Sequence, residues 1–487
     1  MNFTTFEFLL FLVVFFPIYF LLPSKLQKFS LLFFNFYYIS FYKIEFLYFI
    51  LGISTLFYIF GILLEKSKNR KLLLFFSIFC TAGILIYLKF FAYFLIKLDI
   101  QSAFLNSIAS KIYLPLGISF YTLQGIAYIA DIFKNKYKAE KNFLYFLLYM
   151  TFFPIFLQGP ISRYEQLKHQ LIAYNKFNYT KFCFGLQLAL WGLFKKLVIS
   201  NRLNMITNEI FDKSNEYTGI IMILSGMCYA LELYTDFSGA VDISRGIAQS
   251  MNINLTQNFN FPNSAISIKD FWSRWHISLS TWLRDYIYIP LGGNRKGKFR
   301  KYINITITFF ISALWHGVGF KFIIWGLLHA FYQILAELMT NILKKFKDIF
   351  KYKKILSIIS DNNNLETLIS KFTTFILVSI AWIFFRASDW KTAYIMVKKI
   401  NKKFLSSIGK LIESGAIDKK DFIVLIISLF ILYLLERASQ KIKVREKIAK
   451  FYLPFRWFFY ILLIQIIVLF GIYGEGYNPA NFIYMGF

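Results

Sequence analysis

The sequence predicts an all-α polytopic membrane protein. Hydrophobic residues make up 57% of the 487 residues, aromatic residues make up 21%, and the mean hydropathy is +0.53. A soluble domain of this size is far less apolar. Apolar runs close to the length that crosses a bilayer recur along the whole chain, and they are continuous rather than alternating, so they predict helices. The clearer runs start near Phe3, Phe46, Leu72, Tyr113, Phe143, Phe182, Gly219, Phe322, Thr373, Phe422 and Trp457.

Shorter apolar runs, at Phe29–Tyr42 and Ile303–Trp315, either cross the membrane or re-enter it. Together these runs predict about 11 to 13 transmembrane helices, with re-entrant or amphipathic helices among them. The first run ends at Leu22 and is followed by Lys25 and Lys28, without a cleavage site of small residues, so we expect it to be a retained helix. The positive-inside rule then puts the N-terminus outside and the first loop in the cytoplasm.

The net charge of +29 lies mainly in short connectors between the apolar runs. Such basic connectors set the orientation of a membrane protein and face anionic lipids, which makes membrane lipids the expected partner and gives no reason to invoke nucleic acid. A polyanionic cytosolic ligand is an alternative partner for them. The clusters are Lys66–Lys71, Lys134–Lys141, Arg295–Lys301, Lys344–Lys354 and Arg437–Lys450.

The chain reads as a single membrane domain, 1–487. It divides into N-terminal helices (1–235), a more polar and glycine-bearing core (236–330) and C-terminal helices with a terminal aromatic motif (331–487). No internal repeat is visible, which weakens a transporter built from duplicated halves. The three cysteines have no paired spacing, so neither a disulfide framework nor a metal site is expected.

Two tryptophan–histidine pairs stand in the core. One is in Trp272-Ser-Arg-Trp-His276-Ile-Ser-Leu-Ser-Thr-Trp282 and the other in Ala313-Leu-Trp-His316-Gly317. Ser267 and Asp270 have the spacing of a capping box, and the aromatic residues that follow recur at three- and four-residue steps, so we expect one helix there. Pro290 to Gly293 would break it. The indole N–H groups need partners, so this face is expected to meet a polar seam or the membrane interface. The irregular backbone at Pro290–Gly293 predicts a re-entrant or tilted element beside a cavity.

The chain has only four histidines. An ionisable residue inside the membrane is costly unless it faces a partner or a cavity, so His276 and His316 are the functional candidates. A structural histidine that bonds a neighbouring carbonyl is the alternative for His316. We interpret His329 as a wall residue and His169 as a surface residue. Asp236 and Asp242 need cationic partners, for which Arg245 and Arg274 are candidates.

Several motifs, in their joint order, resemble the membrane-bound O-acyltransferase (MBOAT) family, specifically the branch of bacterial alginate and peptidoglycan O-acetyltransferases. The resemblance covers almost the entire chain. Its segments are Pro115–Gln124, Phe152–Arg163, Tyr234–Gly239, Phe271–Arg295, Leu314–Gly317, Ala381–Ala387 and Phe482–Phe487. The resemblance implies a helical fold around a central tunnel, through which an acyl group passes from a cytoplasmic thioester to an acceptor on the other side.

By this resemblance, His316 matches the hallmark histidine of the family and His276 matches its second, more variable histidine. A neutral imidazole is a suitable general base for a hydroxyl nucleophile. We therefore expect His316 to take the proton of the attacking hydroxyl, and His276 to orient it or to hydrogen-bond the thioester carbonyl. The reverse assignment stays open. Gln158, Arg163 and Arg386, like Asp236 and Asp242, either line the tunnel or form buried pairs. Arginines near the cytoplasmic mouth are suited to the phosphates of coenzyme A, but the sequence assigns none of them by number.

The C-terminal segment Phe482-Ile-Tyr484-Met-Gly-Phe487 carries a further candidate. A tyrosine near a membrane edge is commonly an interfacial anchor. The segment resembles a terminal aromatic motif in which a tyrosine is thought to carry the acyl group. By that resemblance, Tyr484 is a candidate covalent relay whose phenol is activated by His316. The Met-Gly-Phe ending departs from the bulkier or polar residues that relatives often have.

The resemblance implies a multi-pass enzyme of the bacterial inner membrane. It would move acetyl from cytoplasmic acetyl-CoA, without a metal, for O-acetylation of a cell-wall or secreted polysaccharide such as peptidoglycan or alginate. A separate extracytoplasmic transferase would be its partner. Three alternatives remain: a glycan or lipid flippase or transporter, a lipid acyltransferase of the same superfamily, and a D-alanyl transferase that uses a carrier-protein donor.

Overall fold

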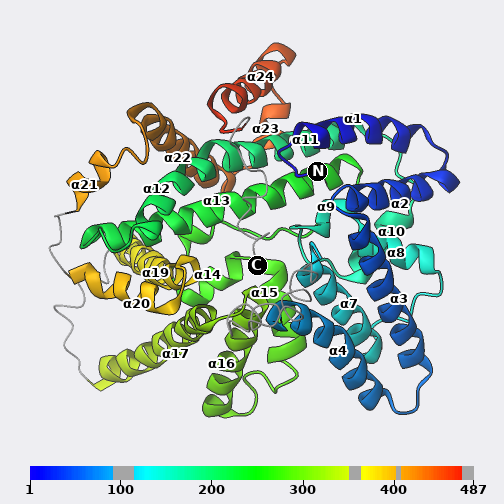
Figure 1. The fold of residues 1–487 in the computed structure, drawn as a ribbon, viewed down its shortest axis with the longest axis horizontal. Coiled ribbons are helices and arrows are strands. Elements are labelled where there is room, and N and C mark those ends of the chain that lie inside the picture. The colour runs from blue at the N-terminus through cyan, green and yellow to red at the C-terminus, as the bar shows by residue number, and fades with distance from the viewer. Residues whose placement is uncertain (92–114, 350–362, 402–406, 474–487) are drawn as a thin grey trace, which may run out of the picture.

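The fold was obtained as a computed structural model, which describes residues 1–91, 115–349, 363–401 and 407–473. Within these ranges the regular secondary structure is helical and contains no strand. The all-α prediction is therefore confirmed. Figure 1 shows helices that cross one another at various angles. The N-terminal helices gather on one side, and α14 and α15 lie near the centre.

The N-terminal helices pack against one another, with α3 against α4 and α7. The end of α3 meets the connector that follows α7. There Glu65 accepts hydrogen bonds from the Lys141 ammonium at 2.7 Å and from the Ala139 N–H at 3.0 Å. Arg70 likewise donates to Asn135 at 2.7 Å. The helices are α1 (Phe6–Leu21), α2 (Ser24–Ser40), α3 (Ile44–Lys66), α4 (Arg70–Ile86), η1 (Tyr87–Phe91), α7 (Ile118–Phe133), α8 (Phe143–Thr151), α9 (Phe153–Phe156) and α10 (Tyr164–Ile172).

The middle of the chain is organised around the long helix α13, which packs on α11, η2 and α12. Glycines allow the backbones of α11 and α13 to approach closely. A Cβ at Gly185 would lie 2.4 Å from the Gly246 carbonyl oxygen, and a Cβ at Gly192 would lie 2.4 Å from that of Gly239. Such small-residue contacts are typical of membrane helices. The elements are α11 (Tyr179–Leu193), η2 (Phe194–Ser200), α12 (Asn201–Asp212), α13 (Ile220–Ser250), η3 (Pro262–Ser264), α14 (Ile268–Arg274), α15 (Ile277–Leu283), η4 (Arg284–Tyr288), α16 (Gly297–His316) and α17 (Phe320–Ile349).

The C-terminal part begins with α19, which packs on both α13 and α17 and so joins the core. By contrast, the last long helix, α24, has only 6% of its apolar window buried, as expected for a helix in contact with lipid. The elements are α19 (Asn363–Arg386), α20 (Trp390–Lys398), η5 (Lys399–Asn401), α21 (Ile408–Glu413), α22 (Lys419–Ser439), α23 (Val444–Ala449) and α24 (Leu453–Phe470).

Eight helices in the described part of the chain are long and apolar enough to cross a membrane, and two shorter apolar helices, Phe6–Leu21 and Ile118–Phe133, add to them. This supports a multi-pass membrane protein. The run that starts near Phe143 does not form one span. Helix α8 ends at Thr151 and α9 starts at Phe153, because Pro154 suits the first turn of a helix but not its interior.

Charged residues of η2 and α13 pair inside the membrane. The ammonium of Lys196 contacts Asp236, and the ammonium of Lys195 lies 2.6 Å from Asp242. The predicted pairing of Asp242 with Arg245 is confirmed, at 3.3 Å. The suggestion that Asp236 pairs with an arginine is wrong, because η2 brings lysines to this face of α13. Arg274 instead binds Asp270 at 2.7 Å.

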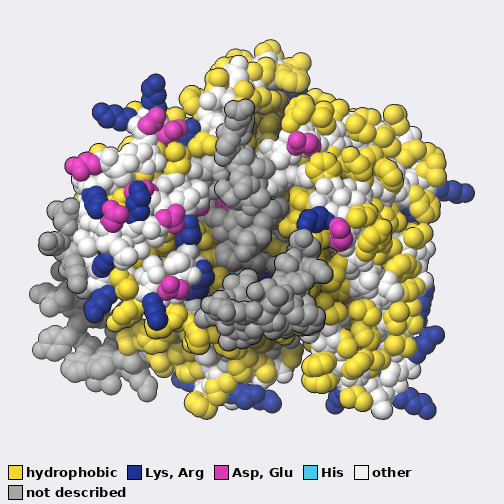
Figure 2. All heavy atoms as spheres, in the orientation of Figure 1, with side chains coloured by type: hydrophobic (Ala, Val, Ile, Leu, Met, Phe, Trp, Pro, Cys, Tyr) yellow, Lys and Arg dark blue, Asp and Glu magenta, His cyan; other side chains and the backbone are white. Residues whose placement is uncertain are grey.

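Figure 2 shows one face of the molecule. Hydrophobic side chains cover much of the region over α1, α2 and α3, whereas acidic and basic side chains mix over α12, α20 and α21. The basic connectors Lys66–Lys71 and Lys134–Lys141 lie side by side through the Arg70–Asn135 contact. Their common side is the one that the positive-inside rule assigns to the cytoplasm.

Candidate active site

His276 lies at a break between two helices. Helix α14 ends at Arg274 and α15 begins at Ile277, so the predicted single helix through these residues is wrong. The predicted capping is confirmed, since the Ser267 hydroxyl accepts a hydrogen bond from the Asp270 N–H at 3.1 Å. The break occurs because His276 has φ of +43°, in the left-handed region that a residue with a Cβ seldom adopts. Such strain persists only where the surroundings impose it, and it often marks a functional site.

Asn258 holds the chain at this break. Its carbonyl oxygen accepts a hydrogen bond from the Ile277 N–H at 3.0 Å, and its side-chain oxygen accepts one from the Ser278 N–H at 3.1 Å. These are two of the first N–H groups of α15, which have no partner within the helix. The structure gives the side chain the task of fixing His276 through the backbone that follows it.

His316 is the last residue of α16. The next residue, Gly317, is fully extended, so the chain leaves the helix at once. A Cβ on Gly317 would lie 2.4 Å from the nearest ring carbon of Phe322, which makes glycine necessary at this position. His316 is therefore held in the last turn of a helix whose exit packs directly against the start of α17.

The two histidines lie in one buried site. The Trp315 ring contacts both: its centroid is 6.0 Å from that of His276 and 4.8 Å from that of His316. The imidazoles are 0% and 2% exposed, so any substrate must reach them through the protein. The Trp315 N–H donates to the Ser119 carbonyl at 3.2 Å, and the Trp282 N–H donates to Leu123 at 2.9 Å, as the need for indole partners predicted.

His329 closes the inner wall of this site. The Trp272 N–H donates to its Nδ1 at 3.2 Å, and the ring of Trp325 separates it from His316, with ring centroids 5.1 Å and 5.0 Å away. The interpretation of His329 as a wall residue agrees with this packing. His169 is exposed on α10, as expected, and lies outside the site. Tyr484 lies outside the described residues.

Lys89 is a member of the site that the sequence analysis did not single out. It comes from η1, and its Nζ donates a hydrogen bond of 2.8 Å to the Trp315 carbonyl, beside His316. One sequence signal was available: a single lysine stands in the apolar run that starts near Leu72, and an ionisable residue inside such a run is a functional candidate.

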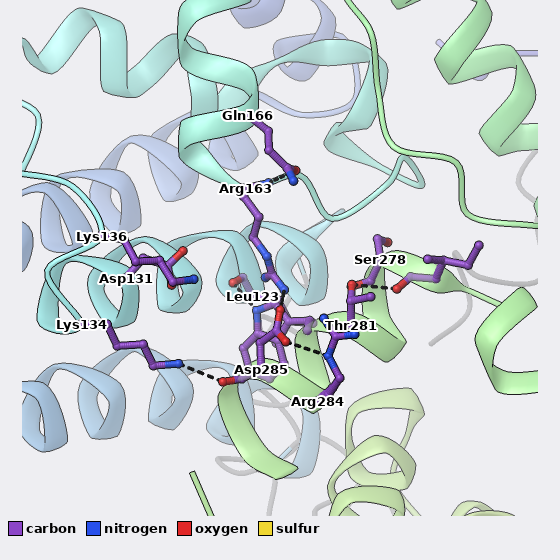
Figure 3. A network of polar contacts seen from close by, with 12 residues as sticks. Leu123, Asp131, Lys134, Lys136, Arg163, Gln166, Ser278, Thr281, Arg284 and Asp285 are labelled. Carbon is purple, nitrogen blue, oxygen red and sulfur yellow. Dashed lines mark hydrogen bonds and ion pairs between the residues drawn. The ribbon is translucent and has the colours of Figure 1, made fainter. Parts of the chain in front are cut away.

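A cationic cluster, here called the Tyr286 cluster, lies where the helix that follows His276 ends. Lys134, Arg163 and Lys136 approach the Tyr286 ring, with distances to its centroid of 4.7, 4.6 and 5.9 Å. Figure 3 shows Arg163 and Arg284 beside the Asp285 carboxylate, at 3.6 and 2.9 Å, whereas Lys134 donates to the backbone carbonyl of Asp285 at 2.9 Å. The fourth cation, Lys136, pairs with Asp131 at 2.8 Å.

Positive charge is in excess in the Tyr286 cluster, because four cations surround the two carboxylates Asp131 and Asp285. Among the described residues, two guanidinium nitrogens of Arg163 are buried without a hydrogen-bond acceptor. The cluster also contacts the connector Lys134–Lys141, so it belongs to the side taken as cytoplasmic. It is chemically suited to an anion. Over the same described ranges, no group of three His, Cys, Asp or Glu residues is placed to hold a metal ion.

Comparison with known proteins decides the family. Residues 134–362 match the family model of MBOAT, the membrane-bound O-acyltransferase family. The chain is 32% identical to the probable alginate O-acetylase AlgI of Pseudomonas aeruginosa over 396 residues, which cover 80% of this chain and 72% of that protein. The chain belongs to the membrane-bound O-acyltransferase family. The predicted recognition is confirmed, and the protein is a membrane-bound O-acyltransferase.

Two other relatives show the range of the family around this chain. It is 30% identical to the peptidoglycan O-acetyltransferase of Helicobacter pylori over 428 residues, covering 80% of this chain and 78% of that protein. It is 31% identical to the teichoic acid D-alanyltransferase of Bacillus subtilis over 243 residues, covering 48% of this chain and 61% of that protein. The matched region of the family model contains both His276 and His316.

Proposed function

We propose that this enzyme takes acetyl from acetyl-CoA in the cytoplasm and delivers it outward for O-acetylation of a cell-wall or secreted polysaccharide. The observation that carries the proposal is the burial of His276 and His316 against the ring of Trp315, within the membrane domain of an O-acyltransferase. The proposal uses two sites among the described residues, this histidine site and the Tyr286 cluster.

In the proposed reaction, His316 is the general base. Its ring nitrogen takes the proton from an attacking hydroxyl as the oxygen forms a bond to the thioester carbonyl carbon. The carbon–sulfur bond then breaks, and the proton passes from His316 to the leaving sulfur, which gives free coenzyme A thiol. His276 hydrogen-bonds the carbonyl oxygen while negative charge develops on it. The exchange of these two roles is the alternative.

The Tyr286 cluster supports a donor that carries phosphate. The side chains of Lys134, Arg163 and Arg284 bring positive charge to one place, and guanidinium groups bind phosphate through paired hydrogen bonds. Residues 276 to 284 join His276 to this cluster, which places the two sites at opposite ends of one short helical stretch. A thioester on a long arm would place its phosphates at the cluster and its acyl carbon at the histidines.

The acceptor is proposed from the relatives and from the tail. Two relatives are named for alginate and for peptidoglycan. The enzyme would lie in a bacterial inner membrane and would reach a polysaccharide outside it through a separate extracytoplasmic transferase. We propose that Tyr484 carries the acetyl group between His316 and that partner. Tyr484→Phe, which removes only the hydroxyl, tests the relay: loss of protein-bound acetyl label is expected, and an unchanged label would contradict it.

The main experiment measures acetyl-CoA turnover by the purified protein in liposomes. We expect His316→Ala to lower the rate by a factor of about 10² to 10⁴, because general-base catalysis contributes that much. His169→Ala is the matched control, since His169 is an exposed histidine of the same chain. Equal rates for wild type and His316→Ala would refute the assigned role, and no turnover in the wild type would refute acetyl-CoA as donor.

D-alanyl transfer is the second candidate, because the chain is 31% identical to the teichoic acid D-alanyltransferase of Bacillus subtilis over about half of its length. Its donor would be an aminoacyl thioester on a carrier protein. The same liposomes should be given acetyl-CoA or a D-alanyl-charged carrier protein in parallel. Turnover of the carrier alone would favour this second candidate, whereas turnover of neither donor would favour the transport alternative.

A further inference from the structure

Lys89 makes an unusual contact for a lysine of a membrane span. It lies near the end of the apolar stretch Arg70–Phe90, where a lysine commonly extends toward water. Its Nζ instead donates to a backbone carbonyl of another helix, that of Trp315, at 2.8 Å. Within the described ranges, this ammonium thus donates to a neutral carbonyl and not to a carboxylate.

The acceptor of this bond is one of the last carbonyls of α16, which lack a partner within the helix. The carbonyl end of a helix carries partial negative charge, so a cation is favourable there. At the same end, the Gly317 N–H donates to the Ala313 carbonyl at 3.2 Å. Lys89 therefore caps α16 from outside, one residue before His316.

Trp315 is consequently tied at two points. Its carbonyl is held by Lys89 of η1, and its indole N–H is held by the Ser119 carbonyl of α7 at 3.2 Å. His316 follows directly, and Lys89 and His316 also interact electrostatically. Two contacts with the N-terminal helices, which are distant in sequence, thus hold the residue before His316, while the rings of Trp325 and Phe385 pack against the imidazole itself.

We propose that Lys89 is a positioning residue for acyl transfer. Its ammonium fixes the last turn of α16, so that the His316 ring stays in line with the attacking hydroxyl. This inference rests on the role proposed above for His316. Lys89 does not exchange a proton with the substrate in this proposal, and it leaves the donor site at the Tyr286 cluster untouched.

The chain offers a matched control in Lys321. Its Nζ also donates to a backbone carbonyl at 2.8 Å, that of Ala387, just beyond the end of α19. The same type of bond thus caps a helix end that carries no histidine. Lys321→Met removes this bond and leaves the Trp315 carbonyl and its contact with Lys89 in place.

The first test is the kinetics of acetyl transfer in liposomes by Lys89→Met, Lys89→Arg and Lys321→Met. Lys89→Met is expected to lower kcat by a factor of about 10², with KM unchanged, because a small misplacement of a catalytic group costs that much. Lys89→Arg, which can donate to the same carbonyl, should recover most of the rate. Equal losses for Lys89→Met and Lys321→Met, or no recovery with arginine, would overturn the proposal.

The second test does not depend on the reaction. Hydrogen–deuterium exchange of the peptide that spans residues 313–319 should become faster in Lys89→Met and stay unchanged in Lys321→Met. If the wild type turns over no thioester, the proposed function fails while this measurement still decides the contact. Unchanged exchange in Lys89→Met would overturn the inference even where acetyl transfer is confirmed.

Discussion

The two histidines of the site are positioned in opposite ways. His276 begins a helix and is held by a strained backbone, with φ of +43°, and by the oxygens of Asn258. His316 ends a helix in relaxed geometry and is held by side chains, namely the Trp315 ring and the Lys89 ammonium. Strain fixes one ring through the chain itself, whereas packing fixes the other through distant helices. The two should therefore respond differently to substitution.

The largest effect is expected from removing the rings. His316→Ala and His276→Ala should each lower acetyl turnover by a factor of about 10² to 10⁴, the contribution of a positioned acid or base. Residues that act as one unit are not additive, so the double variant should be little slower than the worse single variant. Rates for all three in liposomes check this. Fully additive losses would show that the two rings act independently.

A second pair of variants separates the His276 ring from its backbone. His276→Gly and His276→Ala both remove the imidazole, but glycine adopts positive φ without strain. The glycine variant should be more stable than the alanine variant by about 1 kcal/mol, the cost of left-handed geometry. Thermal unfolding in detergent measures the difference. Identical melting temperatures would mean that the backbone at residue 276 carries no strain.

Gly317→Ala disturbs the other histidine through packing. Its Cβ would lie 2.4 Å from the Phe322 ring, so the exit of α16 must shift, at a cost of about 1–3 kcal/mol. Turnover should fall with it, and Gly317→Ala combined with Phe322→Leu should recover part of both. The melting temperature and kcat of the three proteins test this. A double variant no better than Gly317→Ala would contradict the assigned clash.

Asn258→Ala should weaken the start of α15 more mildly. It removes the hydrogen bond from the Ser278 N–H and keeps the backbone bond to Ile277, so a loss of about 0.5–1.5 kcal/mol is expected. Asn263→Ala, in the same connector, is the control. Faster amide exchange at residues 276–280 in the first variant alone would support the contact, and equal exchange in both would refute it.

The smallest expected effect is on the pH dependence of stability, and it comes from a residue outside the membrane-spanning segments. Burial alone would raise the pKa of Glu140. The hydrogen bonds from Lys168 and Tyr164 together outweigh this effect, so the pKa of Glu140 lies below its usual value. A carboxyl with a lowered folded-state pKa stabilises the fold at neutral pH and loses this contribution as the pH falls through that pKa. Glu140→Gln should melt lower at neutral pH and show a weaker acid dependence. Exposed Glu165→Gln is the control, and identical pH profiles would contradict the effect.

Composition and local patterns predicted much of this molecule. Apolar runs predicted the helices, and the spacing of Ser267 and Asp270 predicted the cap of α14. Ionisable residues are rare inside such runs, which made His276 and His316 the functional candidates. Contacts between distant segments were not readable. Nothing near Lys89 indicates that it meets Trp315, 226 residues away, and nothing near Trp275 indicates that Asn258 interrupts the helix. The capping box therefore predicted where α14 starts but not where it stops.

The same limit applies to charge. The sequence showed that Asp236 needs a cation, because a carboxylate within the membrane requires one. Which cation it meets depends on the packing of η2 against α13, which brings Lys196 to Asp236 and the adjacent Lys195 to Asp242. The role of Tyr484 stays a prediction, since that residue lies outside the described ranges.

The indole of Trp315 has a further consequence for how the two histidines work together. Its ring contacts both imidazoles, but its nitrogen is a donor only and is already bonded to the Ser119 carbonyl. Because the indole has no acceptor, it cannot pass a proton from one imidazole to the other. Trp315 therefore acts as a spacer, which brings the two rings into one site without joining them in a proton relay through itself.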